Sequence, residues 1–191
     1  MYLPEHFRES RAVVLRTLIR RHPLAILIAS VNGALGAEHL PLQLIDPAEG
    51  PWRLRGHLAR ANPLWRALPD GSAVLAVFRG ADHYVSPTDY ADRACNSRDV
   101  PTWNYAAIHV SGTIRFIHDP AGLLEIVGAL TAEHEHNRQP VWTLADLTDA
   151  DRATLRDALS AEGLIEEALD ELVREPGHGP QSPAPADARK P

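Results

Sequence analysis

Short apolar runs broken by turn signals are the feature that most constrains how this chain folds. Leu24 to Val31 is a β-rich run, and Asn32-Gly33 directly after it is a strong signal for a tight hairpin. In the returning run, residues 39–44, leucines alternate with polar residues or proline, as in a strand with one buried face. Trp52 to Leu58 continues the pattern and places on one face Arg53, Arg55 and His57. These runs predict an antiparallel meander.

Two further strands are expected in the middle of the chain. Ala73 to Phe78 is apolar enough for a buried strand. Trp103 to Ile117 is a longer run that places on one face Tyr105, Ala107, His109 and Ser111. The segment from Gly80 to Pro101 is predicted to be a long loop, and loops of that length are often functional.

Helical patterns flank the predicted strands. Residues 11–22 carry apolar side chains at helical spacing after Ser10, a candidate N-cap, and Pro23 ends that helix. Asp119-Pro120 begins a second helix that runs to about Asn137. This order of elements predicts a mainly β fold with helical additions, an α+β antiparallel barrel.

The C-terminal part of the chain is predicted to be helical and then disordered. Thr148 and Asp151 have the spacing of a capping box. A helical, acidic stretch is expected from Leu155 to Arg174, with Gly163 as a separator. From Pro176 onward the composition is Pro-rich and polar, which is typical of a disordered tail.

Composition excludes several classes of function. The net charge is −6, which argues against a nucleic-acid partner because phosphate binding needs a positive surface. Lys190 is the only lysine, so no Schiff-base lysine is available before the last two residues. Cys95 is the only cysteine, which excludes an internal disulfide and a covalently attached haem. The run 24–31 is too short to span a bilayer, and Met1 to Glu5 lacks a signal-peptide pattern, so we expect a cytoplasmic protein.

Five stretches together resemble the PaiB family, and their order and spacing match as well. They are Met1 to Phe7, His39 to Leu42, Gly56 to Trp65, His83 to Pro87 and Val100 to His109. The resemblance implies a split β-barrel similar to that of pyridoxamine-phosphate oxidase. It also implies a homodimer that holds a flat cofactor at the subunit interface. The domains expected on this basis are a cofactor-binding barrel at 1–142, a helical extension at 143–175 and a tail at 176–191.

The family is identified as FMN-binding and as negative transcriptional regulators, but the chain departs from its pattern twice. Thr88-Asp89-Tyr90 stands where the family has a small residue followed by Trp-Tyr. The C-terminal Lys-Leu-Ser-Gln-Asn-like motif of the family is missing after Trp142. These departures argue against ordinary FMN binding and ordinary regulation.

One enzymatic branch of this barrel resembles the chain, namely piperazate synthase. The resemblance implies haem b as the cofactor and an amino-acid substrate, N5-hydroxy-L-ornithine, which is cyclised to L-piperazic acid by forming an N–N bond. The alternatives are an FMN-binding regulator of the PaiB type and a flavin-dependent oxidoreductase on the same fold.

The candidate cofactor residues belong to two of the matching stretches. His57 is the candidate metal ligand, because a neutral imidazole binds iron well, and in the flavin hypothesis His57 and Arg60 contact the phosphate. The alternative is a structural histidine that bonds a turn carbonyl. His109 and His39 are reserve axial ligands. The remaining candidates are Asn62, Thr102, Trp103 and Asn104, for which packing and turn formation are the alternatives.

The candidate catalytic residues are Tyr84, Arg98 and Tyr105. Tyr84 would move a proton, Arg98 would hold the carboxylate of an amino acid, and Tyr105 would lie along a flat ring. The alternative for the long loop is an ordinary dimer-interface segment. Glu133-His134-Glu135-His136 does not predict a metal site, since residues two apart on a helix do not share a face.

Overall fold

The computed structural model describes residues 3–45, 51–89, 100–166 and 171–175. Its centre is one antiparallel sheet in the order β3-β2-β7-β8-β9-β5-β4. These strands span Ala34–Pro41 (β3), Leu24–Val31 (β2), Ser72–Val85 (β7), Thr102–Ile117 (β8), Leu159–Glu166 (β9), Arg53–Arg55 (β5) and Gln43–Ile45 (β4). Shorter strands at Arg8–Glu9 (β1), Leu58–Ala59 (β6) and Glu171–Glu175 (β10) complete it. The antiparallel α+β architecture predicted from the alternation is confirmed.

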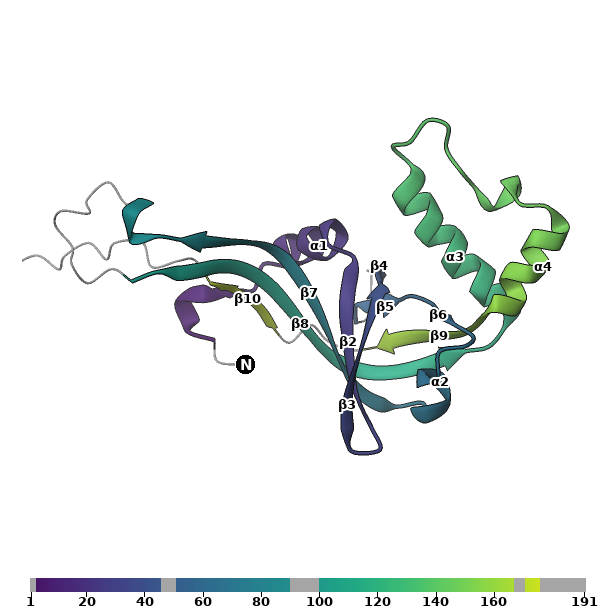
Figure 1. Ribbon diagram of the computed structural model, residues 1–191, viewed down its shortest axis with the longest axis horizontal. Coiled ribbons are helices and arrows are strands. Elements are labelled where there is room, and N and C mark those ends of the chain that lie inside the picture. The colour runs from purple at the N-terminus through teal and green to yellow at the C-terminus, as the bar shows by residue number, and fades with distance from the viewer. Residues whose placement is uncertain (1–2, 46–50, 90–99, 167–170, 176–191) are drawn as a thin grey trace, which may run out of the picture.

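The β2–β3 hairpin forms where the sequence predicts it. Asn32 and Gly33 have φ angles of 52° and 82°, the left-handed values that a type I′ turn requires. The strands then pair in full register from Val31 and Ala34 to Leu24 and Pro41. The hairpin projects downward in Figure 1 from the centre of the molecule.

The core is formed mainly by strand residues of the sheet, and α1, Ala12–Arg21, contributes to it. Leu15 and Ile19 of α1 are buried, as the helical spacing predicts, and they belong to one apolar cluster with Phe78, Ile108 and Ile114. This burial supplies the main driving force for folding.

The start of α1 corrects the expected N-cap. Arg11, not Ser10, is the N-cap residue, and it makes no side-chain capping bond. Its backbone N–H instead donates to Glu9 Oε1 at 2.9 Å, and its guanidinium pairs with the same carboxylate. The pair lowers the pKa of Glu9 to about 2, chiefly because Arg11 donates hydrogen bonds to the carboxylate.

The segment expected to be a long loop is partly strand, and that prediction is wrong for residues 80–85. β7 continues to Val85 because its backbone keeps pairing with β8, as far as Val85 with Thr102. A bulge between Arg79 and Asp82 interrupts the register and absorbs the extra residue. A 3-10 helix, η2, follows at Pro87–Asp89. The extended ribbon of β7 and β8 beyond this bulge, residues 79–85 and 102–105, is called the arm below (Figure 1).

The expected strand from Trp52 to Leu58 is also interrupted. It divides into β5 and β6, with Gly56 and His57 between them. An added Cβ at Gly56 would lie 2.7 Å from Leu42 Cδ2 and 2.7 Å from the carbonyl oxygen of Pro41. The chain can therefore approach β3 closely at this point only with glycine.

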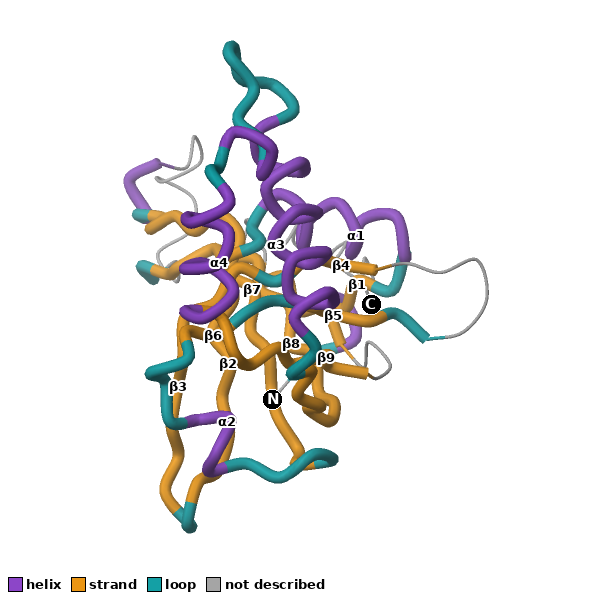
Figure 2. Tube along the Cα trace, turned by 90° about the vertical axis from the view of Figure 1, so that its right-hand side faces the viewer, coloured by secondary structure: helices purple, strands orange, loops and turns teal. Residues whose placement is uncertain are grey.

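Helices cover one end of the sheet. α3 spans Pro120–Glu135 and α4 spans Asp149–Ala158, and they pack against each other and on β9 (Figure 2). Asp119 caps α3 by accepting the N–H of Gly122 at 2.9 Å, and Thr148 accepts the N–H of Asp151 at 3.1 Å. Both helix starts confirm the sequence prediction. A short helix, α2, occupies Leu64–Ala67, and 3-10 turns lie at Glu5–Phe7 (η1) and Leu144–Asp146 (η3).

The helical expectation for residues 155–174 is wrong for residues 159–166 and 171–174, which are strands, while residues 167–170 lie outside the described residues. β9 pairs with β8 on one side and with β5 and β6 on the other, and β10 pairs with β8 and β1. These residues form strands rather than a helix because β5 and β8 would otherwise expose unpaired backbone groups along their edges. The segment expected as a separate helical extension therefore supplies two strands of the central sheet. The predicted tail from residue 176 lies outside the described residues.

Candidate functional site

His57 lies in the break between β5 and β6, where Gly56 brings the backbone against β3. Its Nδ1 is buried and has no hydrogen-bond partner among the described residues. Burial also lowers the pKa of His57 below its usual 6.5, which favours the neutral imidazole at neutral pH. The alternative of a structural histidine that bonds a turn carbonyl therefore has no support at Nδ1.

Little room remains around the His57 ring. A hollow of about 10 Å³ beside it is lined by apolar side chains of Leu27, Leu40, Leu42, Leu58 and Ile114. That volume suits about one water molecule. A flat macrocycle does not fit into this hollow, so any iron bound by His57 would have to approach from another side of the ring.

The turn after His57 has a structural role of its own. Asn62 Oδ1 accepts the backbone N–H of Leu64 at 2.9 Å, which anchors the start of α2. Trp65 Nε1 donates to the carbonyl oxygen of Arg60 at 3.2 Å. The presence of Asn62 is therefore explained by its role in the turn. Arg60 is exposed at the surface.

Arg55 joins the sheet to α3. Its Nε donates to Gln43 Oε1 at 2.9 Å, and its Nη1 lies 3.0 Å from Glu125 Oε1. Gln43 Nε2 in turn donates to Glu133 Oε2 at 2.7 Å. These contacts occupy the guanidinium, so the role of Arg55 is explained by helix docking.

The second group of candidates lies on the arm. Tyr84 and Trp103 are cross-strand partners whose rings meet edge to face with centroids 5.8 Å apart. Both are exposed, by 45% and 55% respectively, although aromatic side chains of this size are usually covered. Thr102 pairs with Val85 near the end of the arm, and Tyr105 is half-buried at its base.

Asn104 is the polar residue of the arm that stands out. Its Oδ1 is buried and has no hydrogen-bond partner among the described residues, although the residue lies opposite exposed His83. A buried acceptor without a donor costs about 1–3 kcal/mol. Such a group marks a position where another molecule can supply the missing donor.

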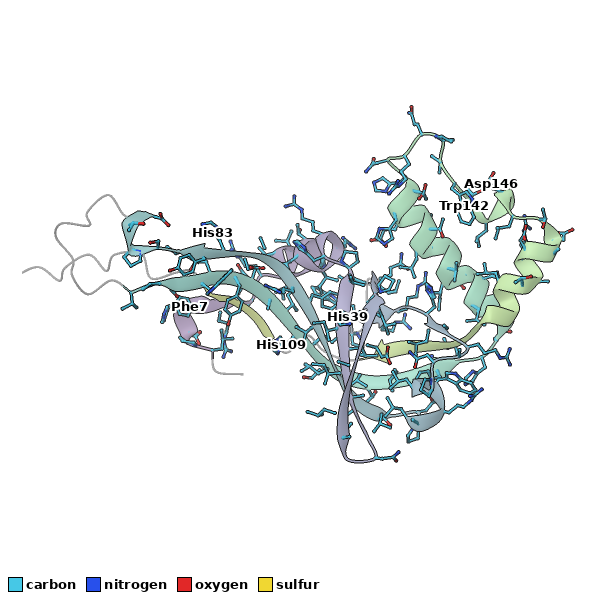
Figure 3. The ribbon with its side chains drawn as sticks, viewed as in Figure 1. Phe7, His39, His83, His109, Trp142 and Asp146 are labelled. Atoms are coloured by element: carbon cyan, nitrogen blue, oxygen red, sulfur yellow. The ribbon has the colours of Figure 1, made fainter. Side chains whose placement is uncertain are left out.

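One copy of the chain does not bring the two groups of candidates together. Figure 3 shows His83 on the arm at one end of the molecule and His39 on the hairpin near its centre. His109 lies on β8 between them, half-buried and opposite Val77 and Glu171. Arg98 lies outside the described residues.

A further hollow, which no sequence pattern predicted, lies between α1 and the base of the arm. It measures about 450 Å³ and is lined by Val13, Val14, Thr17, Leu18, Arg21, His22, Ala81 and Ala106. None of these residues was a candidate. The adjacent small residues Gly80 and Ala81 are the only local signal, and they were assigned to a loop.

Comparison with known sequences identifies relatives along most of the chain. A family described as "Putative FMN-binding domain" matches residues 1–161. The uncharacterized protein YKL070W of Saccharomyces cerevisiae is 32% identical over 157 residues, which cover 72% of this chain and 92% of that protein. The protease synthase and sporulation protein PAI 2 of Bacillus subtilis is 28% identical over 74% of this chain. The match spans 65% of PAI 2, less than two thirds of its length.

Solved structures show the same fold. The FAD and heme binding protein from Mycobacterium smegmatis superimposes with a TM-score of 0.59 at 18% identity, covering 97% of this chain and 94% of that one. The flavocytochrome Anf3 from Azotobacter vinelandii gives a TM-score of 0.56 at 13% identity, covering 100% and 92%. The split-barrel architecture is therefore confirmed. No helix among the described residues is long and apolar enough to cross a bilayer.

Proposed function

The chain belongs to the family of FMN-binding domains, and from this premise we propose that it works as a homodimer that holds a flavin where the arm of one copy meets the barrel of the other. The observation that carries the proposal is the separation of the two candidate groups within one copy. A second copy related by two-fold symmetry would present its arm to the first barrel and receive the first arm in return.

The arm has the features of a surface that becomes covered. Tyr84 and Trp103 expose a contiguous pair of aromatic rings. Beyond Tyr105, β7 is the only described strand that pairs with β8, and a ribbon of two strands is marginally stable in water by itself. Contact with a second barrel and a flat cofactor would cover the rings and stabilise the ribbon.

The donor set fits a flavin. The amide of Asn104 combines an unpartnered acceptor with donors, which matches the adjacent N–H and carbonyl on the pyrimidine edge of an isoalloxazine ring. Exposed Arg60 offers a guanidinium for the phosphate. When bound, the flavin would supply hydride or single-electron transfer, while these residues orient the ring and the aromatic pair excludes water.

Absorbance spectroscopy tests the cofactor directly. We expect the purified protein to be yellow, or to become yellow on reconstitution with FMN, and to sediment as a dimer. Asn104→Leu should weaken FMN binding about tenfold, measured by quenching of flavin fluorescence. Arg115→Gln, an exposed change on the barrel half of the same strand, serves as the matched control. A colourless protein that refuses FMN would overturn the proposal.

A haem-dependent activity is the second candidate, and the state of His57 favours it. The lowered pKa and the unpartnered Nδ1 suit a neutral imidazole that binds iron. Two of the similar structures also carry haem-related names, the FAD and heme binding protein and the flavocytochrome.

In this second candidate the reaction is ring closure of N5-hydroxy-L-ornithine. The α-amine attacks N5 as the N–O bond breaks. The leaving hydroxide takes up a proton and the attacking nitrogen releases one, so the net change is loss of water and no external oxidant is needed. Bound haem would act as a Lewis acid on the N–O bond. Tyr84, on the arm of the second copy, would donate the proton to the leaving oxygen, and the site between the copies would hold the two nitrogens in contact.

The Soret band separates the two candidates. Haem reconstitution should give a Soret band that His57→Ala shifts or removes, while His39→Ala leaves it unchanged. Conversion of N5-hydroxy-L-ornithine to piperazic acid, followed by mass spectrometry, then tests the reaction. A protein that binds FMN and shows no Soret band after haem addition excludes the haem activity. A regulatory role predicts a mobility shift of DNA, against which the net charge of −6 argues.

A further inference from the structure

We propose that the hollow between α1 and the base of the arm is a second binding site, for a small amphipathic anion with an apolar body. Its volume of about 450 Å³ lies within the range of small-molecule sites. The apolar part of its lining comes from Val13, Val14, Leu18, Ala81 and Ala106. This site goes beyond the proposed cofactor site and shares no lining residue with the hollow at His57.

The β-bulge of β7 builds this hollow. The register shift between Arg79 and Asp82 brings Gly80 so close to β8 that an added Cβ would lie 3.2 Å from Ala106 Cβ. The same Cβ would lie 3.5 Å from Leu18 Cδ1 of α1. Helix and ribbon thus meet at Gly80, and the short side chains of Ala81 and Ala106 leave the space beside this contact open.

The polar part of the lining includes a cation. Arg21 and His22 stand where α1 ends, and among the residues that the structure describes no aspartate or glutamate lines the hollow. Arg21 is exposed, and no carboxylate partner is recorded for it among the described residues. By contrast, Arg79 on the adjoining strand pairs with Asp82 at 2.7 Å. The lining therefore offers a charge that complements a carboxylate or sulfonate.

An apolar wall together with an exposed arginine favours one class of ligand. The wall of valine, leucine and alanine favours a compact aliphatic or aromatic body. The guanidinium at the rim favours a planar anionic head, which it can bind through two parallel hydrogen bonds. Thr17 adds no donor for the anion, because its hydroxyl donates to the carbonyl oxygen of Val13 at 2.7 Å.

Two fluorescent dyes with the same aromatic body test the site. Anilinonaphthalene sulfonate carries an anionic group, and phenylnaphthylamine does not. We expect both to bind the full-length protein. Arg21→Gln should weaken binding of the sulfonate about threefold to tenfold and leave the neutral dye unchanged. Arg20→Gln, on the same helical turn but outside the lining, is the matched control for charge.

A filling variant tests the location. Ala81→Leu should weaken binding of both dyes at least about fivefold, since the larger side chain occupies the hollow. Ala73→Leu, another exposed alanine of β7, should leave both affinities unchanged. Circular dichroism and the sedimentation coefficient confirm that each variant keeps its fold and its oligomeric state.

The outcomes separate this site from the cofactor site. Equal dye binding by Ala81→Leu and Ala73→Leu would overturn the proposal, as would failure of either dye to bind. Loss of the dimer in Ala81→Leu would show that a second copy covers the hollow, which also overturns it. Binding of FMN should be unaffected by Arg21→Gln, so a colourless protein that still binds both dyes would contradict only the cofactor proposal.

Discussion

The barrel half and the arm half of β7 and β8 differ in the burial of their side chains, although they belong to the same strands. In the barrel half Val74, Ala76 and Phe78 are buried at every second position, and Phe78 is fully buried. Beyond the bulge no residue of β7 from 79 to 85 is buried. The backbone pairing continues, but the apolar core ends at the bulge.

The difference shows that pairing and packing are separate contributions. Backbone hydrogen bonds extend the ribbon as far as Val85 with Thr102, but they add little net stability without a buried face. The barrel half is therefore expected to carry the folding energy, and the arm half to be available for recognition. Four changes test this division.

The largest effect is expected in the barrel half. Phe78→Ala should lower the free energy of unfolding by about 3–5 kcal/mol, because it leaves a cavity in a fully buried part of the core. Urea denaturation followed by circular dichroism measures it. Tyr84→Ala, an aromatic truncation on the same strand but in the arm, is the comparison and should cost less than about 1 kcal/mol. Equal losses would refute the division.

A smaller loss of stability is expected at Gly56, where the backbone approaches β3 most closely. Gly56→Ala should destabilise the protein by about 1–3 kcal/mol, since the new methyl group would overlap Pro41 and Leu42. At Gly36 of β3 an added Cβ would meet only Ala29 O, at 4.0 Å. Gly36→Ala is therefore the control and should leave the thermal midpoint nearly unchanged. A Gly56→Ala variant as stable as this control would mean that the break before His57 tolerates a side chain.

The pH dependence of stability is expected to depend on the barrel as well. Burial lowers the pKa of His57 from 6.5, so the unfolded chain binds a proton more readily than the folded one. This contribution to stability is present above pH 6.5 and is lost as the pH falls through the folded-state pKa. His57→Asn should flatten the fall in unfolding free energy over that window, whereas His83→Asn on the arm should not. Parallel curves for both variants would contradict the assignment.

The smallest effect on folding is expected at the arm. Trp103→Ala should change the unfolding free energy by less than about 0.5 kcal/mol at a dilution where the parent protein is monomeric. At concentrations where the proposed dimer forms, the same variant should dissociate more readily than the parent, because the exposed ring would be lost from the proposed dimer contact. Urea denaturation measures the first quantity and sedimentation equilibrium the second. A large loss of monomer stability would show that the arm belongs to the core.

Sequence patterns predicted the parts of the fold whose signals are local. The Asn32-Gly33 turn, the caps at Asp119 and Thr148, and the strand at residues 73–78 each depend on a few neighbouring residues. The strand character of residues 159–166 has no such signal. It arises from the edges of β5 and β8, which are distant in sequence, so a helical pattern was overridden by long-range pairing.

The candidate site was also predictable only in part, because some of its features depend on pairing between strands that are distant in sequence. The resemblance to a family selected His57 and Asn104, and both have a buried polar atom without a partner among the described residues. It also selected Asn62, which the turn into α2 explains. The hollow at Ala81 and Ala106 depends on a bulge in the pairing of β7 with β8. No local sequence pattern predicts that bulge.

The position of β9 has a consequence for synthesis of the protein. β9 lies between β8 and β5, so the sheet joins these strands only after residues 159–166 are available. During translation the earlier strands leave the ribosome with two unpaired edges, which are prone to associate with other nascent chains. Chaperone demand should therefore be greatest just before the β9 segment emerges, and ribosome stalling upstream of it should favour aggregation.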